Sequence, residues 1–218
     1  MIGQDVKLIE YSKTIDRYNC ITHAFGAVLG VFGTVAITMK ASSLRHFVSA
    51  LIYSVTLVIV FTVSAVYHGL PQGEAKRIAR LVDHSAVPML IAGTTTPCAM
   101  VSLYEIKPSL GITVTVIGWL CALFGLFSKL FFFEKLKKIT MAVYIISCVI
   151  MLSSVIPVTG QINMGAFGYL VAGCIAYLIG AVLCGLGVKR PVLHVIFHIF
   201  VIIGAAVHFL TIHNFVIC

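Results

Sequence analysis

Four ionisable residues, His68, Asp83, His194 and His198, lie at the ends of long apolar segments of this sequence. Ionisable groups are costly in such segments and usually mark a functional site. His194 and His198 are four positions apart, so on a helix they share one face with Cβ atoms about 5–6 Å apart. This spacing suits two ligands of one zinc ion. His68 is the candidate third ligand, because catalytic zinc commonly takes three protein ligands and keeps one position open.

The alternative is that each histidine is an interior residue with a local hydrogen bond, because a buried polar group needs only one satisfied partner. For a single histidine this alternative is the more common one. The pair His194 and His198, together with His68 at the same expected membrane depth, favours metal binding instead.

Asp83 and Ser64 are the candidate catalytic residues beside these ligands. Asp83 could cap the N-terminus of the third expected helix, act as a base or orient a ligand histidine. Ser64 lies one helical turn before His68. Its hydroxyl would ordinarily bond to its own backbone, but beside a metal ligand it could donate to a developing oxyanion. The other acidic residues are expected in the tail and the loops: Asp5, Glu10, Asp16, Glu74, Glu105 and Glu134.

The remaining histidines have different expected places. His84 directly follows Asp83, and neighbouring helix positions point about 100° apart, so only one of the two should face the site. His23 begins the first apolar run at the same depth and is a spare candidate ligand. His208 lies about 15 Å deeper than His198. A hydrogen bond in the core is favoured for it over a proton relay. Interfacial positions are expected for His46 and His213.

The composition indicates that the chain folds in a lipid bilayer and not in water. The 218 residues are 60% hydrophobic and 10% charged, with a mean hydropathy of +1.09, whereas soluble domains carry roughly 25% charged residues. An integral membrane protein is therefore expected. The net charge of +8 does not indicate nucleic acid, because the basic residues lie between apolar runs and form no binding stripe. The seven cysteines contain no C-x-x-C pair, and neither a disulfide framework nor a cysteine metal site is expected.

Seven apolar runs are long enough to cross the hydrocarbon as helices, which needs about 20 residues each. We therefore expect an all-α, seven-transmembrane bundle that forms a single domain over residues 1–218. The N-terminal segment lacks the basic-then-apolar order of a cleaved signal peptide. The sequence Gly93–Pro97 should bend the third helix. The expected spans are residues 20–39, 47–70, 84–103, 110–132, 139–158, 165–186 and 192–216.

The basic residues predict the orientation of these spans. Twelve of the fifteen lysines and arginines fall in the N-terminal segment and alternate loops, and three fall in the other loops. The positive-inside rule then predicts a cytoplasmic N-terminus and an external C-terminus. His68, Asp83, His194 and His198 would all lie at the cytoplasmic ends of three different helices. We expect a multi-pass protein of the cell membrane, with membrane lipids as its partners.

Several motifs in this chain resemble those of the hemolysin III family, the bacterial branch of the progestin and adipoQ receptor proteins. They are I-T-H-A-F-G at Ile21–Gly26, S-A-V-Y-H at Ser64–His68, D-H-S-A and A-G-T-T-T-P within Asp83–Pro97, and H-V-I-F-H-I-F-V-I-I-G-A-A-V-H-F at His194–Phe209. Each motif is short, but together, in order and in the expected spans, they are specific. The resemblance covers nearly the whole chain and implies a bacterial plasma membrane.

The resemblance implies seven helices, a cytoplasmic N-terminus and a zinc ion bound by His68, His194 and His198. In related receptors and alkaline ceramidases, the acid that matches Asp83 contacts the zinc water, and the serine that matches Ser64 lies beside it. Those relatives hydrolyse lipid amides or are proposed to do so. The chain is short at both ends, so receptor-type ligand binding through an extracellular domain is not expected.

Three functions follow from these expectations. The first is a zinc-dependent intramembrane hydrolase of a lipid amide. The second is a membrane regulator or sensor without catalysis, in which zinc has a structural role and four protein ligands close the site. The third is a hemolysin-like pore or a proton-linked transporter that uses His208 and the cytoplasmic histidines. The third ranks last, because the centres of the spans offer few polar residues to line a wet path.

Overall fold

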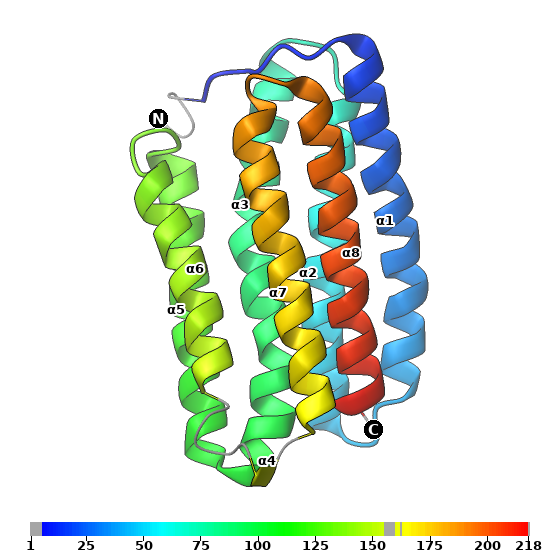
Figure 1. The fold of residues 1–218 in the computed structure, drawn as a ribbon, viewed down its shortest axis with the longest axis vertical. Helices are drawn as coiled ribbons and strands as arrows, with labels where there is room; N and C mark the ends of the chain where they lie inside the picture. The colour runs from blue at the N-terminus through cyan, green and yellow to red at the C-terminus, as the bar shows by residue number, and fades with distance from the viewer. Residues whose placement is uncertain (1–5, 155–159, 162, 218) are drawn as a thin grey trace.

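The protein is a helical bundle, as the apolar runs predict. The computed structural model describes residues 6–154, 160–161 and 163–217, and all long elements among them are helices (Figure 1). The elements are α1 (Lys13–Met39), α2 (Leu44–Gly69), α3 (Glu74–Pro97), a π-helical segment η1 (Cys98–Leu103), α4 (Tyr104–Ile106), α5 (Pro108–Phe131), α6 (Lys137–Ser153), α7 (Met164–Gly187) and α8 (Pro191–Phe215).

Six helical stretches in the described residues are long and apolar enough to cross a membrane. They are α1, α2, α5, α7, α8 and the continuous stretch from α3 to α4, Glu74–Ile106. Their large apolar side chains remain exposed along the outside of the bundle, Phe25 and Phe32 among them. Exposed apolar surface of this extent needs a lipid solvent. The chain is a multi-pass membrane protein.

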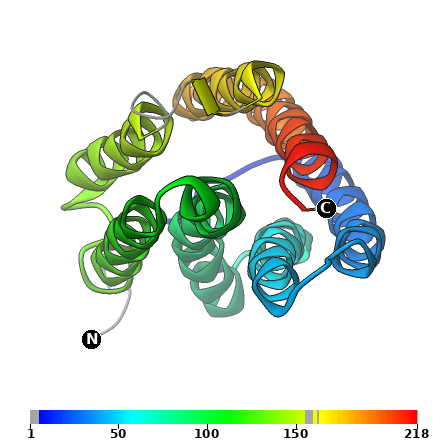
Figure 2. The ribbon, with the colours of Figure 1, turned by 90° about the horizontal axis from the view of Figure 1, so that it is seen from below.

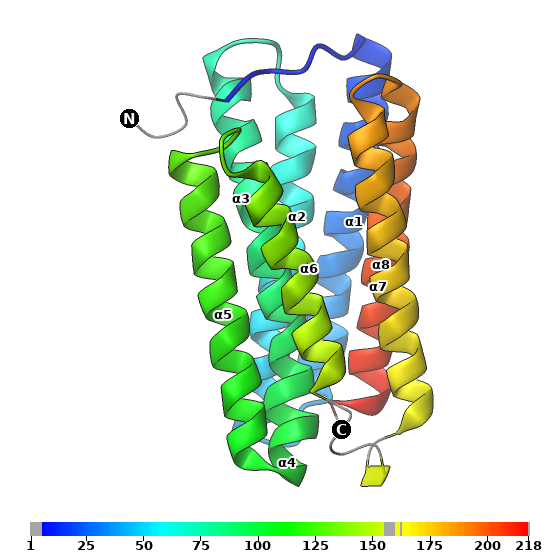
Figure 3. The same cartoon turned by 60° about the vertical axis from the view of Figure 1, so that its left-hand side comes forward.

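The helices follow one another around a closed bundle (Figure 2). α1 packs between α2 and α8, α3 packs between α2 and α5, and α7 packs on α8. α5 and α6 lie together on one side of the molecule, whereas α1, α7 and α8 lie on the other (Figure 3). The N-terminal segment crosses one end of the bundle, and the C-terminus lies at the other end (Figure 1). The last turn of α2 and the first turns of α1, α3 and α8 therefore meet at the end that carries the N-terminal segment.

Two helices, α1 and α3, begin seven and ten residues earlier than the apolar runs predicted, and the others begin within three residues of the prediction. α1 begins at Lys13, after Ser12, whose hydroxyl accepts a hydrogen bond from the Ile15 amide at 3.3 Å. α3 begins at Glu74, after Gly73, whose φ of 147° favours glycine. Asp83 consequently lies in the third turn of α3 and not in the first. Its expected role as an N-cap is wrong, because the helix already extends for nine residues before it.

The π-helical segment η1 directly follows Pro97, at the end of the sequence that was expected to bend the third helix. Proline has no amide hydrogen to donate to the preceding turn. The hydroxyls of Thr94, Thr95 and Thr96 donate to the carbonyls four residues earlier at 2.8–2.9 Å. Trp119 of α5 donates its indole N–H to Thr96 at 3.1 Å. These contacts satisfy polar groups inside an apolar bundle.

Candidate metal centre

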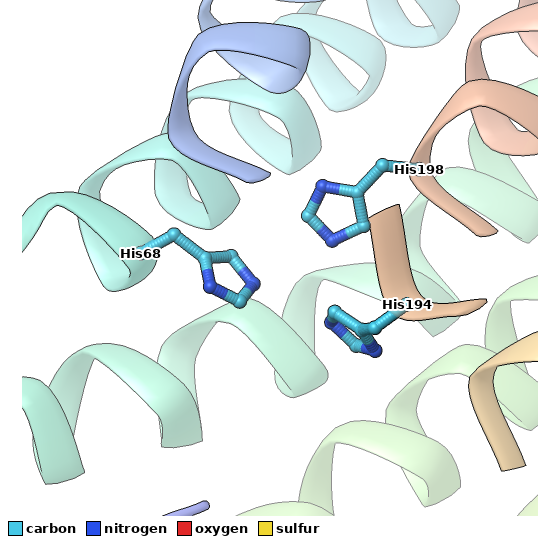
Figure 4. Close-up of side chains that lie close together, drawn as sticks. All are labelled: His68, His194 and His198. Carbon is cyan, nitrogen blue, oxygen red and sulfur yellow. The ribbon is translucent and has the colours of Figure 1, made fainter. Parts of the chain in front are cut away.

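Three histidines from two helices meet at the end of the bundle. His68 lies in the last turn of α2, and His194 and His198 lie in the first turns of α8. One ring nitrogen from each residue lies within 4.8 Å of the other two. The ring centroids are 4.9–5.4 Å apart, and the rings border one shared space (Figure 4). The three residues predicted from the sequence are thus brought together.

The orientation of His68 is set by a carboxylate from α1. Its Nδ1 lies 2.8 Å from Oδ1 of Asp16. A carboxylate can only accept a hydrogen bond, so Nδ1 carries the proton and donates it. The Nε2 atom of His68 is buried and has no hydrogen-bond partner. It is therefore the nitrogen that carries the free lone pair. A carboxylate behind a histidine is the usual support of a metal ligand.

The same carboxylate is held by a buried lysine. Nζ of Lys76 lies 2.7 Å from Oδ2 of Asp16 and donates to the Leu70 carbonyl at 3.0 Å. The Lys76 side chain is only 1% exposed. Asp16 thus links α1 to both the end of α2 and the start of α3. Its negative charge compensates the positive charge of Lys76.

His198 is oriented by the backbone of α1. Its Nδ1 lies 3.2 Å from the Asn19 carbonyl oxygen. A carbonyl can only accept, so Nδ1 donates and Nε2 is again the free nitrogen. His198 is 1% exposed. The ring of His23, also buried, stacks on it with centroids 3.7 Å apart and planes 12° apart. His23 lies against a member of the three-histidine group without belonging to it.

The N-terminal segment covers His194. The Tyr11 ring stacks on the His194 imidazole with centroids 5.1 Å apart, and the Cys184 sulfur lies 4.0 Å from its Nδ1. Burial raises the pKa of Tyr11, so its hydroxyl stays protonated. Val6 of the same segment packs with Leu81 and Phe133. The centre is therefore enclosed from the side of the loops.

Ser64 and Asp83 lie beside the centre on α2 and α3. The Ser64 side chain is buried and within hydrogen-bonding reach of the Asp83 carboxyl group. That carboxyl group also interacts electrostatically with Tyr67 and Cys184, which neighbour His68 and His194. Within the described residues, Asp83 is not among the side chains whose ligand atoms converge. Three imidazoles, with an acid and a hydroxyl nearby, form the candidate site.

The other histidines lie outside the three-histidine group. His84 packs against the Phe133 ring, with 5.0 Å between the ring centroids. His208 donates Nε2–H to the Leu170 carbonyl at 3.1 Å, the core hydrogen bond that was favoured for it. His46 lies near Glu105 at the opposite end of the bundle, and His213 contacts Asn214 there.

A cavity of about 240 Å³ also lies at that opposite end. It is lined by apolar side chains of η1, α6, α7 and α8 and by a few polar ones, among them Ser102, Glu105 and Thr211. None of the three histidines lines this cavity. Its chemistry is therefore separate from that of the candidate metal centre.

Comparison with known proteins identifies the family of this chain. Residues 11–209 match the family described as Haemolysin-III related. The chain belongs to this family. It is 31% identical to Hemolysin-3 of Bacillus cereus over 194 residues, which cover 88% of this chain and 87% of that protein. It is 32% identical to the Hemolysin-3 homolog of Bacillus subtilis over 194 residues, which cover 88% and 89%.

A more distant relative of this haemolysin-III related protein is human. The chain is 26% identical to the monocyte to macrophage differentiation factor of Homo sapiens over 202 residues, 90% of this chain and 82% of that protein. The matched region of the family, residues 11–209, includes every residue of the candidate site. The resemblance that the short motifs indicated is confirmed.

Sequence reasoning assigned Asp16 to the polar tail and gave Lys76, Asn19 and Tyr11 no role at the site. A pattern of polar residues at helical spacing could have predicted the positions of Asp16 and Asn19. Together with His23 they occupy positions i, i+3 and i+7, which share one helix face, and Asn19 and His23 are buried in α1. Extending the first helix back over these polar positions would have placed the Asp16 carboxylate at the depth of His68.

Proposed function

We propose that His68, His194 and His198 bind a zinc ion and that the protein is an intramembrane hydrolase of lipid amides. The observation that carries the proposal is the convergence of three imidazoles, two of which have Nδ1 committed to an acceptor and Nε2 free. Three neutral nitrogens suit zinc. The carboxylate behind His68 and the carbonyl behind His198 are the supports that zinc-binding histidines usually have.

Three protein ligands favour the hydrolase over a structural zinc site, because structural zinc normally has four protein ligands. When bound, the ion supplies Lewis acidity that polarises an amide carbonyl and activates water. Asp83 would accept a proton at its carboxylate. The Ser64 hydroxyl orients that carboxylate or donates to the oxygen on which negative charge develops. Tyr11 and the N-terminal segment limit the access of bulk water to the ligands.

We further propose that the bundle is a single domain with seven spans, with α6 as the span that follows α5. The N-terminal segment would be cytoplasmic and the C-terminus external, because twelve of the fifteen basic residues lie in the N-terminal segment or in the helix ends and loops at its end of the bundle. The metal centre would then face the cytoplasmic leaflet. A lipid substrate would enter from that leaflet.

The test of metal binding is the zinc content of purified protein. Wild type should contain about one zinc per chain, and His194→Ala should lose most of it. His213→Ala is the matched control, because it removes a histidine from the far end of the same helix and should leave the zinc content unchanged. Wild-type zinc in His194→Ala would refute the assignment of the ligands.

The test of catalysis uses the same preparation. Zinc-loaded wild type should release fatty acid from a panel of ceramide-like amides, whereas Asp83→Asn should keep its zinc and lose turnover by about 100-fold or more, the usual contribution of a positioned acid–base group. Zinc-loaded wild type with no turnover on the whole panel would instead favour the regulator, in which zinc is structural.

A further inference from the structure

One buried cation beside the metal centre has no counter-ion within reach. Arg80 of α3 is 7% exposed, and its Nε and Nη1 atoms have no hydrogen-bond partner. Among the described residues, no carboxylate oxygen lies within 4.0 Å of its guanidinium. An uncompensated buried charge strongly destabilises a fold, far more than a satisfied ion pair does. The position therefore calls for an anion that the described part of the chain does not provide there.

Lys76, one turn earlier on α3, shows how this fold satisfies a buried cation. It is more deeply buried than Arg80, and it has both the Asp16 carboxylate and the Leu70 carbonyl as partners. Arg80 has neither kind of partner. Asp83, three residues later, interacts with Arg80 only at longer range, and its carboxyl group is engaged by Ser64. Within one helix, Lys76 therefore has its partners, whereas Arg80 has no carboxylate or carbonyl partner among the described residues.

A second basic side chain contacts the same aromatic ring as Arg80. Its Cζ lies 5.3 Å from the centroid of the Phe133 ring, and Nζ of Lys129, a residue 9% exposed, lies 4.8 Å from the same centroid. The ring face attracts each cation, but it holds two positive charges close together. The edge of His84 meets the same ring. This basic cluster, Arg80 and Lys129 around Phe133, borders the first turns of α3.

Arg80 of this basic cluster lies near two of the three histidines. Arg80 is close enough to interact electrostatically with His68 and His194 as well as with Asp83. An anion held at Arg80 would lie beside the metal centre and at the end of the bundle where α3 begins. In a membrane-spanning helix this is the depth of lipid headgroups, where arginine commonly meets their charged oxygens.

We propose that Arg80 binds an oxyanion, the phosphate or carboxylate group of a lipid, at a subsite next to the metal centre. A guanidinium is the side chain best suited to this ligand, because it donates two parallel hydrogen bonds to two oxygens of one carboxylate or phosphate. The subsite requires neither bound zinc nor hydrolysis, so it stands independently of the proposed function. It would hold the charged end of a lipid while the rest of the lipid lies along the bundle.

The test compares how one substitution changes the unfolding temperature with and without an anionic lipid, because the change should have opposite signs in the two conditions. Arg80→Met removes the charge and keeps an apolar side chain of similar reach. In neutral detergent without added anion, this variant should unfold at a higher temperature than wild type, because an unpaired buried charge is gone. In nanodiscs of phosphatidylglycerol, it should unfold at a lower temperature than wild type, because the ligand contact is lost. In nanodiscs of phosphatidylcholine alone, whose phosphate is already paired with its own choline, the reversal should be weaker.

Arg77→Met is the matched control. Arg77 lies on the same helix but pairs with Glu74 at its surface, so its removal should not produce the reversal. Arg80→Lys keeps the charge but lacks the paired donors, and by native mass spectrometry it should retain phosphatidylglycerol about tenfold more weakly than wild type, a difference of about 1.4 kcal/mol.

Soluble probes identify the source of the anion. If inorganic phosphate or octanoate in detergent raises the unfolding temperature of wild type but not of Arg80→Met, the subsite also takes free anions. A response to phosphatidylglycerol alone assigns it to a lipid headgroup. The proposal is overturned if Arg80→Met responds to every probe as wild type does, or if wild type responds to none. It is equally overturned if His194→Ala abolishes the responses while Arg80→Met leaves them intact, since the anion would then bind at the metal.

Discussion

Two imidazoles at the metal centre face groups that can only accept a hydrogen bond. The Asp16 carboxylate fixes the tautomer of His68, and the Asn19 carbonyl fixes that of His198. In both residues the proton is held on Nδ1, so the free lone pair is on Nε2 before any metal arrives. A site whose ligands are oriented in advance loses less conformational entropy on binding. Asp16 is therefore the residue outside the ligand set on which metal affinity should depend most.

Replacing Asp16 with alanine should weaken metal affinity and stability for separable reasons. Loss of the carboxylate behind His68 should lower zinc affinity by about 10- to 100-fold, measured by competition with a chelator. It should also leave Lys76 as an unpaired buried cation, at a cost of about 3 kcal/mol in the free energy of unfolding.

The double variant Asp16→Ala, Lys76→Met separates the two effects. It should recover most of the thermal stability, because no charge is left unpaired, but it should not recover zinc affinity. Glu10→Ala is the control, since Glu10 is an exposed acid of the N-terminal segment. Wild-type zinc affinity in the double variant would show that Asp16 acts on the fold alone.

The residues of the centre differ in how visible they were in the sequence. His194 and His198 were predictable because a metal pair on one helix has a fixed spacing, and His68 because it shares their depth. Asp16 was missed because the start of α1 is polar and was assigned to the tail. Its two partners, His68 and Lys76, are 52 and 60 positions away along the chain, and no local pattern encodes these contacts.

At the scale of elements, apolar runs predicted where helices exist but not where two of them begin. Sustained hydrophobicity marks the part of a helix inside the hydrocarbon. The first turns of α1 and α3 are polar, and the Asp16–Lys76 ion pair joins them. Hydropathy assigns polar first turns of this kind to loops, because it detects only the apolar part of a helix. Asp83 was misplaced for the same reason.

The packing of α7 on α8 depends on a glycine. A Cβ atom added at Gly173 would clash with the His208 imidazole, whose Nε2 donates to the Leu170 carbonyl one turn away. Small residues let membrane helices approach closely enough for such bonds. Gly173→Ala should therefore push α8 away from α7 and lower the free energy of unfolding by about 1–3 kcal/mol, the usual cost of overpacking.

Gly168→Ala is the matched control in the same helix, because a Cβ there meets no atom within 4 Å. It should raise stability slightly, since alanine is the better helix former by about 0.5–1 kcal/mol. Thermal unfolding in detergent measures both variants. Equal unfolding temperatures for the two would mean that α8 tolerates displacement at His208.

At the scale of the whole molecule, alternate loops lie at opposite ends of the bundle, and charge separates with them. The N-terminal segment and the loops around Lys76, Lys138 and Lys189 lie at one end, and those around Lys40 and Lys107 lie at the other (Figure 1). The shortest of the seven long helices in the described residues is α6. Its 17 residues span about 25 Å, which is less than the roughly 30 Å of a typical hydrocarbon core. A short span is accommodated by local thinning of the bilayer and by flanking lysines such as Lys137 that extend to the interface.

Alkaline phosphatase fusions in a bacterial host distinguish seven spans from six, because this reporter needs its disulfides and is active only outside the cytoplasm. With seven spans and a cytoplasmic N-terminus, fusions after Lys107 and Asn163 should be active, and fusions after Lys138 and Lys189 should be inactive. If α6 did not cross, the side of every later loop would be exchanged. The fusion after Asn163 would then be inactive and the one after Lys189 active. The start of α8, with His194 and His198, would lie across the membrane from the end of α2, so the two would have no common metal. The candidate metal centre therefore requires seven spans, and the fusion after Lys189 tests both the topology and the site.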